Sequence, residues 1–234
     1  MSIVVSCSDD QIFLFDPKST ALFVIDMQRD FIFPDGDDKN YPAEGGPAPL
    51  QKVVPKVKSV LEAARMAGLF IVHTREGHES DLSTLHPLRR LPSCLVGAEI
   101  GAPGPMGRIL VRGEYGHDFV DGLHPQKGEL VIDKQGFDSF YKTNLEAELN
   151  KRGITHMIIC GVTTECCIQS TIRGAVDRGY FTLLIGDCCA SYHAYMHEMT
   201  LSMFPAQGNL FGWVCEVDAL MPKLKSLSAT TAAS

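Results

Sequence analysis

The stretch Gly161-Val162-Thr163-Thr164-Glu165-Cys166-Cys167-Ile168 carries two adjacent cysteines from an apolar run into a helical pattern. The run before it, Met157 to Cys160, is typical of a buried parallel strand, and the segment after it, Ile168 to Arg178, has the pattern of a helix that ends at Gly179. Unpaired N–H groups and the macrodipole at a helix start favour a thiolate and can bind an oxyanion. A cysteine is more often a small buried apolar residue. Its place at this turn favours a nucleophile instead.

Apolar runs alternate with helical patterns along most of the chain, which predicts an α/β fold. We expect strands at 20–25, 69–73, 130–133, 156–160, 181–185 and 210–214. We expect helices at about 54–64, at 193–203 and at 217–224. A further helix is expected to begin at a capping box formed by Thr143 and Glu146. This alternation predicts a parallel β-sheet of about six strands with helices on both faces, a three-layer, Rossmann-like arrangement whose ligand cleft lies at the carboxyl ends of the strands.

The segment from about 74 to 127 breaks this alternation. It contains five prolines, many glycines and little periodicity, so we interpret it as a functional excursion with short helices and not as a linker. Within it, residues 108–112 form an apolar island that could pair as a short strand. We expect one domain over residues 1–225 and a frayed Ser/Thr/Ala-rich tail over 226–234.

The composition narrows the possible partners. The chain has 234 residues, 45% of them hydrophobic, and a formal net charge of −7. Its basic residues are scattered, which argues against nucleic acid and anionic membrane and favours a small-molecule substrate. The eight cysteines have no zinc or disulfide spacing, and we expect neither a signal peptide nor a membrane-spanning run. We therefore expect a cytoplasmic protein with reduced thiols. No nucleotide-binding glycine motif occurs either.

Three polar residues follow the predicted strands: Asp26, Lys134 and Cys167. Taken alone, Asp26 could be a helix cap and Lys134 a surface cation. Parallel strands, however, bring such ends together. An Asp can act as a general base and acid, a Lys can stabilise a neighbouring thiolate, and a Cys can form an acyl intermediate. Together they predict cleavage of an amide-like C–N bond.

The sequence resembles the cysteine hydrolases of the isochorismatase-like superfamily. The resemblance rests on segments 24–31 (VIDMQRDF), 132–134 (IDK) with Ser139-Phe140, and 160–167 (CGVTTECC). It implies a parallel sheet with helices on both faces, and Asp26 as base, Lys134 as electrostatic partner and Cys167 as nucleophile. It also implies a cis peptide before Thr163, an oxyanion hole made of the Thr163 and Cys167 N–H groups, and a homodimer or homotetramer.

Further segments look most like the biuret hydrolase and ureidoacrylate amidohydrolase branch of this superfamily. They are 74–78 (TREGH) with 81–83, 111–114 (VRGE) with 116–118, 187–192 (DCCASY) with 197–199, and 206–208 (AQG). Nicotinamidases instead carry a metal site with an Asp-x-His and a further His. Here the stretch from His73 to His78 lacks the carboxylate spacing, so we expect neither a metal site nor a cofactor.

A urea-like substrate offers several N–H donors and carbonyl acceptors that a selective site must pair. Candidate polar partners are Gln207, Glu76, Arg75 and Arg112, each of which could instead be a surface or structural ion-pair residue. Candidate aromatic walls are Phe31, Phe137, Tyr141 and Trp213, although such residues are more often part of the core.

These features predict a cysteine-dependent amidohydrolase that cleaves a small ureido or carbamoyl amide through a thioester and releases ammonia. Two alternatives stay open. One is vinyl-ether hydrolysis of isochorismate, which needs a proton donor near Asp26 but no thiolate. The other is a non-catalytic, ligand-binding member of the family, for which a broken triad would be expected.

Overall fold

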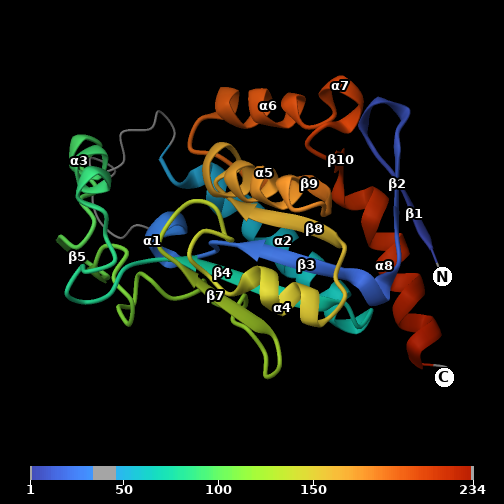
Figure 1. The fold of residues 1–234 in the computed structure, drawn as a ribbon, viewed down its shortest axis with the longest axis horizontal. Coiled ribbons are helices and arrows are strands. Elements are labelled where there is room, and N and C mark those ends of the chain that lie inside the picture. The colour runs from blue at the N-terminus through green and yellow to red at the C-terminus, as the bar shows by residue number, and fades with distance from the viewer. Residues whose placement is uncertain (1, 34–45, 233–234) are drawn as a thin grey trace.

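The computed structural model describes residues 2–33 and 46–232. Its centre is a six-stranded sheet with strand order β10-β9-β8-β3-β4-β7 (Figure 1). The strands are β3 (Thr20–Ile25), β4 (Phe70–Glu76), β7 (Leu130–Lys134), β8 (His156–Val162), β9 (Phe181–Ala190) and β10 (Trp213–Cys215). All neighbouring strands are parallel, which confirms the predicted α/β fold.

Helices cover both faces of this sheet (Figure 1). Helices α2 (Ala48–Met66) and α8 (Val217–Ala232) pack on one face, and α4 (Leu145–Lys151) and α5 (Gln169–Asp177) pack on the other. Strand β3 shows why both faces are apolar: Leu22 belongs to the core under α2, whereas its neighbour Phe23 belongs to the core under α5. Because successive side chains of a strand point to opposite faces, a strand covered on both sides needs a continuous apolar run.

The start of α4 differs from the prediction. The helix begins at Leu145, and its N-cap residue, Asn144, makes no side-chain capping bond. Thr143 instead accepts a hydrogen bond from the Leu145 N–H at 3.3 Å and donates one to the Ser139 carbonyl at 2.6 Å. In the described chain the Thr143 hydroxyl accepts from the Leu145 N–H and not from the Glu146 N–H, and the Glu146 carboxylate pairs with Arg178 at 3.1 Å, so the predicted capping box is wrong.

The carboxyl-terminal end also differs. Helix α8 continues to Ala232, so a frayed tail from residue 226 is wrong for this part of the chain, and residues 233–234 lie outside the described residues. Leu220 and Leu224 are buried and Leu227 packs against the same core, so the apolar stripe of the helix extends into the predicted tail. Upstream of α8, the strand predicted at 210–214 is β10, preceded by α6 (Ala194–Met203) and the short α7 (Ala206–Asn209).

The remaining elements are short. At the amino-terminal end, β1 (Ile3–Ser6) and β2 (Ile12–Phe15) form an antiparallel hairpin that the sequence did not reveal. The predicted excursion contains α3 (Pro87–Leu95) and the pair β5 (Pro103–Gly104) and β6 (Gly107–Arg108). The apolar island at 108–112 does not form a continuous strand, since only Arg108 belongs to β6 and Val111 makes an isolated bridge with His78. Figure 1 places α3 and β5 beyond the carboxyl ends of the central strands, close to α1 (Arg29–Ile32).

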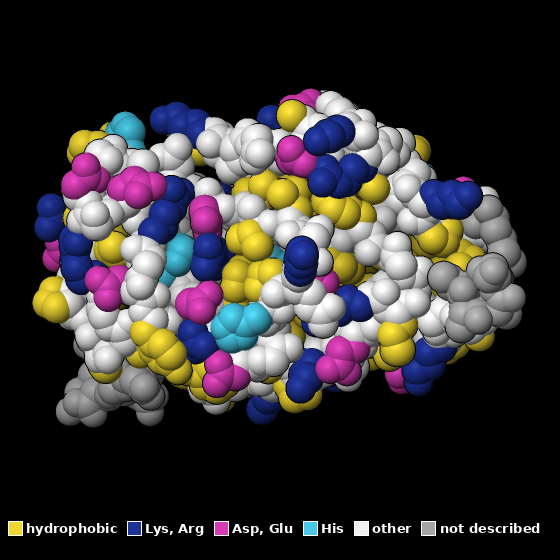
Figure 2. All heavy atoms as spheres, turned by 90° about the horizontal axis from the view of Figure 1, so that it is seen from below, with side chains coloured by type: hydrophobic (Ala, Val, Ile, Leu, Met, Phe, Trp, Pro, Cys, Tyr) yellow, Lys and Arg dark blue, Asp and Glu magenta, His cyan; other side chains and the backbone are white. Residues whose placement is uncertain are grey.

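On the face shown in Figure 2, acidic and basic side chains are intermixed and form no continuous basic stripe. In the described part of the chain, no helix is both long and apolar enough to cross a bilayer.

Gly161 in β8 lies where β8 and β3, two strands that lead into the site, approach each other closely. Its φ angle is +124°, and an added Cβ would lie 2.1 Å from the Ile25 carbonyl oxygen of β3. We expect Gly161→Ala to lower the free energy of unfolding by about 3 kcal/mol or more, because backbone would have to move. The matched control is Gly179→Ala, where φ is +83° but no atom lies within 4 Å of the added Cβ. Urea denaturation of both variants measures the difference, and equal losses would contradict this account.

Candidate active site

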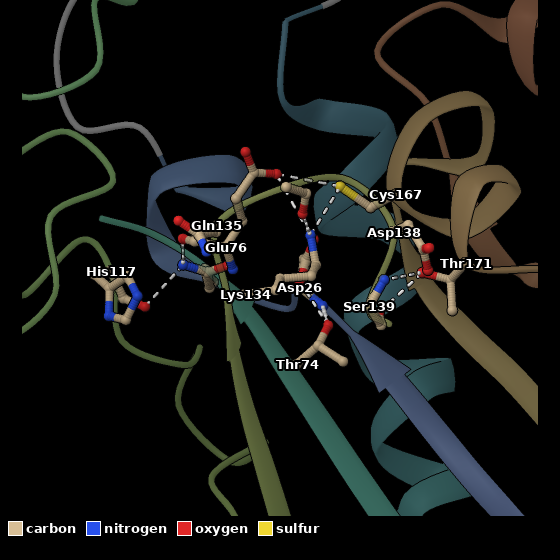
Figure 3. A network of polar contacts seen from close by, with 12 residues as sticks. Asp26, Thr74, Glu76, His117, Lys134, Gln135, Asp138, Ser139, Cys167 and Thr171 are labelled. Carbon is tan, nitrogen blue, oxygen red and sulfur yellow. Dashed lines mark hydrogen bonds and ion pairs between the residues drawn. The ribbon is translucent and has the colours of Figure 1, made fainter. Parts of the chain in front are cut away.

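Four side chains meet at the carboxyl ends of the central strands (Figure 3). Asp26 follows β3, Glu76 ends β4, Lys134 ends β7, and Cys167 lies in the π-helical turn Thr164–Ile168 that follows β8. The Lys134 Nζ atom lies 2.7 Å from Asp26 Oδ2, 3.4 Å from Cys167 Sγ and 3.5 Å from Glu76 Oε2. The sheet therefore places one ammonium among two carboxylates and a thiol, all of them buried.

Asp26 is held in a constrained position. Its φ angle is 49°, in the left-handed region, and its Oδ1 accepts a hydrogen bond from the Thr74 hydroxyl at 2.6 Å. Burial raises the pKa of the Asp26 carboxyl above its ordinary value; the Lys134 charge opposes this rise and the Glu76 charge adds to it. A raised pKa makes Asp26 a stronger base than an exposed carboxylate.

Lys134 stays charged although it is buried. Burial by itself would lower its pKa, but the neighbouring acidic groups, first Asp26 and then Cys167 and Glu76, outweigh burial and raise the pKa. A further hydrogen bond runs from Nζ to the Gly136 carbonyl at 2.9 Å. The site therefore contains a permanent cation.

The sequence favoured a thiolate at Cys167, whereas the surroundings of this side chain favour the protonated thiol. Its contact with Cys166 and its burial raise the thiol pKa well above the ordinary value, and Lys134 only partly opposes them. The thiol thus keeps its proton until a base removes it. Asp26 and Glu76 are the carboxylates beside it, with Glu76 Oε2 at 3.4 Å from Sγ.

Glu76 is fixed by side chains from two other segments. Arg89 of α3 donates from Nη2 to Glu76 Oε1 at 2.7 Å. Gln28 binds the Glu76 backbone through its side-chain amide, accepting from the N–H at 2.7 Å and donating to the carbonyl at 2.9 Å. Burial favours a higher pKa for Glu76, but Lys134 and Arg89 outweigh it and lower the pKa. Glu76 is therefore the second anion of the cluster.

A cavity of about 600 Å³ opens onto Cys167. Thr163, Cys166 and Cys167 line it on the side of the strand-to-helix turn, where the peptide between Val162 and Thr163 is cis, as the resemblance implied. Apolar side chains form much of its wall: Phe31, Leu88, Pro92, Val96, Ile100 and Leu110. Cys167 thus lies on the wall of a largely apolar cavity.

The family model described as the isochorismatase domain matches residues 20–219, most of the chain. This chain belongs to the isochorismatase family. A curated relative, the ureidoacrylate amidohydrolase RutB of Serratia proteamaculans (strain 568), is 28% identical over 234 residues, covering 93% of this chain and 88% of the relative.

Solved structures of the same family are also similar. An isochorismatase family protein from Desulfovibrio vulgaris subsp. vulgaris str. Hildenborough is 27% identical with a TM-score of 0.70, covering 88% of this chain and 98% of that one. A cysteine hydrolase from Pseudomonas syringae pv. phaseolicola 1448A has a TM-score of 0.75 at 24% identity, with 91% and 95% covered, and supports the fold. The chain is accordingly a hydrolase of the isochorismatase family.

In this family member, three of the predicted substrate-binding residues line the cavity: Phe31, Phe137 and Glu76. Tyr141 lies instead on a neighbouring cavity of about 660 Å³ that also includes Arg89 and Phe137.

The structure places the other predicted substrate-binding residues away from the cavity. Arg75 pairs with Asp133 and Asp118, at 2.8 and 3.2 Å, and Arg112 pairs with Glu79, so both guanidinium groups are used in ion pairs. Gln207 is exposed on α7, where its φ angle is 55°. Trp213 packs against Phe13 of the amino-terminal hairpin, with ring centroids 5.3 Å apart. These four residues are therefore not among those that line this cavity, and their contact with a substrate stays a prediction.

Sequence analysis missed several residues of the site. Thr74 and Gln28 each lie two residues from a recognised site residue, but alternation along an extended chain gives no indication of the hydrogen bonds that they make. No sequence pattern identified Arg89 as a site residue, because it contacts Glu76 only once the segment 74–127 has folded. The apolar residues of α3 were missed for the same reason.

The cluster also brings three potential metal-ligand atoms together, since ligand atoms of Asp26, Glu76 and Cys167 lie within 4.8 Å of one another. The Lys134 ammonium lies against all three. It supplies the positive charge that a metal ion would otherwise bring, and a second cation there would be repelled by it.

The hydrogen bond from Thr74 to Asp26 gives a prediction on pH dependence. Donation to a carboxylate stabilises its charged form, so Thr74→Val should raise the pKa of Asp26 further. The acid limb of the kcat/KM profile, where activity is lost as Asp26 is protonated, should then move to higher pH. The control is Thr171→Val, which removes a buried hydroxyl bonded to Ser139 at 2.9 Å and should leave the acid limb in place. Equal acid limbs in the wild type and Thr74→Val would exclude Asp26 as the titrating base.

Proposed function

We propose that this hydrolase cleaves the C–N bond of a small ureido or carbamoyl amide through a thioester on Cys167 and releases ammonia. The observation that carries the proposal is the position of the Cys167 sulfur, which faces a cavity while it lies 3.4 Å from the Lys134 ammonium. A thiol, a carboxylate base and a fixed cation are the parts that covalent amide hydrolysis needs.

The first half of the reaction forms the thioester. Asp26 takes the thiol proton as Sγ attacks the carbonyl carbon, and the carbonyl oxygen becomes an oxyanion bound by the Thr163 and Cys167 N–H groups. Asp26 then returns the proton to the substrate nitrogen, the C–N bond breaks, and ammonia leaves. The raised pKa of Asp26 suits both steps, because it makes Asp26 a stronger base toward the thiol than a carboxylate of ordinary pKa.

The second half regenerates the enzyme. A water molecule loses a proton to Asp26 and attacks the thioester carbonyl, and collapse of the tetrahedral intermediate breaks the C–S bond. The proton passes from Asp26 to sulfur, and the product leaves as a carboxylic or carbamic acid. Lys134 keeps its proton throughout and stabilises whichever of Asp26 and Cys167 carries the negative charge.

Glu76 fits the ureido part of the proposal. It lines the cavity beside the nucleophile and is anionic, so it can accept an N–H of the substrate while Sγ attacks the neighbouring carbonyl. The amidohydrolase name of the curated relative supports an amide substrate of this kind.

Lys134→Ala tests the assignment. Without its cation the thiolate is less stable, so turnover measured as ammonia release should fall by at least a factor of ten, which corresponds to about 1.4 kcal/mol of barrier. The control is Lys56→Ala, which removes a lysine paired with Asp187 at the surface, 2.6 Å away, and should leave turnover within about twofold. Retention of more than about a tenth of wild-type turnover by a folded Lys134→Ala enzyme would show that the triad is assigned wrongly.

Two more variants separate the alternatives. Cys167→Ser should abolish amide hydrolysis, whereas vinyl-ether cleavage through a proton from Asp26 needs no thiol and would persist. Combining Lys134→Ala with Asp26→Asn should add much less than the sum of the single effects, since these groups act as one unit.

A further inference from the structure

The cavity is poor in positive charge. Among the described residues that line it, Arg89 is the cationic side chain, and its guanidinium already binds other protein groups. It donates to Glu76 Oε1 at 2.7 Å and to the Gln135 carbonyl at 2.8 Å, and it stacks over the Phe137 ring with its central carbon 4.2 Å from the centroid. A substrate carboxylate would have to displace Glu76 to reach it.

A second carboxylate lines the same cavity. Glu165 belongs to the π-helical turn of the nucleophile, and its Oε2 atom is buried with no hydrogen-bond partner among the described residues. The histidine near it does not supply a compensating charge, because burial lowers the pKa of His197. The His197 Nδ1 atom instead shares a hydrogen bond with the Thr164 hydroxyl at 2.8 Å. Glu165 therefore disfavours an anion and favours an N–H donor.

The size and lining of the cavity point the same way. A volume of about 600 Å³ lies within the range of roughly 300 to 1,000 Å³ that is usual for drug-sized ligands, far more than a molecule as small as biuret fills. Leu88, Pro92 and Val96 of α3 and Ile100 and Leu110 form its apolar part. A substrate too small to cover this apolar surface would not gain the binding free energy that comes from removing the surface from water.

We propose that this site selects a neutral carbamoyl amide with an apolar substituent and excludes anionic ureido acids such as ureidoacrylate. The inference rests on the proposed function and narrows it. For a substituted biuret, Cys167 attacks the terminal carbonyl, the terminal C–N bond breaks with loss of ammonia, and water completes the hydrolysis to a substituted allophanate. The substituent stays on the product and lies against α3, and Glu165 lies on the wall of the same cavity.

Three compounds test this selectivity: biuret, 1-phenylbiuret and 1-(4-carboxyphenyl)biuret. The last two differ by one ring carboxylate group, which carries a negative charge. We expect kcat/KM for ammonia release from 1-phenylbiuret to exceed that from biuret by at least tenfold and that from the carboxylated compound by at least a hundredfold. An equal or higher value for the carboxylated compound, or for biuret, would overturn the inference while leaving the proposed function intact. No ammonia from any of the three would overturn the proposed function, and the inference with it.

Glu165→Gln tests the source of the discrimination. It replaces the carboxylate by an amide of the same shape, so the ratio of kcat/KM for the phenyl over the carboxyphenyl compound should fall by at least tenfold. The matched control is Glu198→Gln on α6, which removes an exposed carboxylate outside the cavity lining and should leave the ratio unchanged. Equal ratios in the wild type and Glu165→Gln would overturn the role of Glu165.

Ala98→Trp tests the apolar part of the cavity. Ala98 lines the cavity, and the larger side chain should lower kcat/KM for 1-phenylbiuret by at least tenfold more than for biuret. Leu95→Trp is the control, because Leu95 is exposed on the same segment and lies outside the lining. A loss that is equal for both substrates in Ala98→Trp would show that the substituent lies elsewhere.

Discussion

The buried ammonium of Lys134 is the constraint on which the site depends. Removing an unpaired charge from water costs several kcal/mol, so Lys134 is tolerated only with anionic or polar partners at short distance. Asp26, Glu76 and the Gly136 carbonyl provide them. Glu76 and Lys134 are direct partners in the β4–β7 pairing, so the register of the two strands fixes the position of the cation. A slip by one residue would turn these side chains to the opposite face of the sheet.

The same cluster determines which proton moves. The ammonium is held in its charged form and the thiol in its neutral form, while burial makes Asp26 a stronger base than usual. In the mechanism that we propose, the mobile proton therefore passes between Cys167 and Asp26, and Lys134 contributes charge without exchanging a proton. In that mechanism the ammonium stabilises one negative charge, first on Asp26 and then on Cys167. A thiol that is not ionised at rest can therefore still be the proposed nucleophile.

The sequence allowed the sheet, and the proximity of Asp26, Lys134 and Cys167, to be predicted because both follow from local patterns. Continuous apolar runs identify parallel strands, and Asp26, Lys134 and Cys167 each come within a few residues of such a run. The failures have a different origin. The Thr143 capping box and the frayed tail from Ser226 were inferred from side-chain type. In the structure the Thr143 hydroxyl binds the Leu145 N–H, the Glu146 carboxylate pairs with Arg178, and the partly buried Leu227 packs against the core. Arg75 and Arg112 were predicted to bind the substrate because a guanidinium can pair with a carbonyl or a carboxylate, and this stays a prediction. Their ion pairs were not foreseen, because the acidic partners are distant in sequence.

The chemistry and the specificity of this site are encoded in different parts of the chain, and only the first can be recognised from sequence. Strand ends supply the reacting groups, and parallel pairing brings them together whatever the loops do. The wall comes from α3 and the segment after it, whose position depends on tertiary contacts such as that between Arg89 and Glu76. This ion pair joins the two parts: it fixes α3 over the cavity and neutralises the cation that would otherwise attract an acidic substrate. Changes in the excursion can therefore alter substrate choice without disturbing the catalytic cluster, provided that Glu76 keeps a positively charged partner.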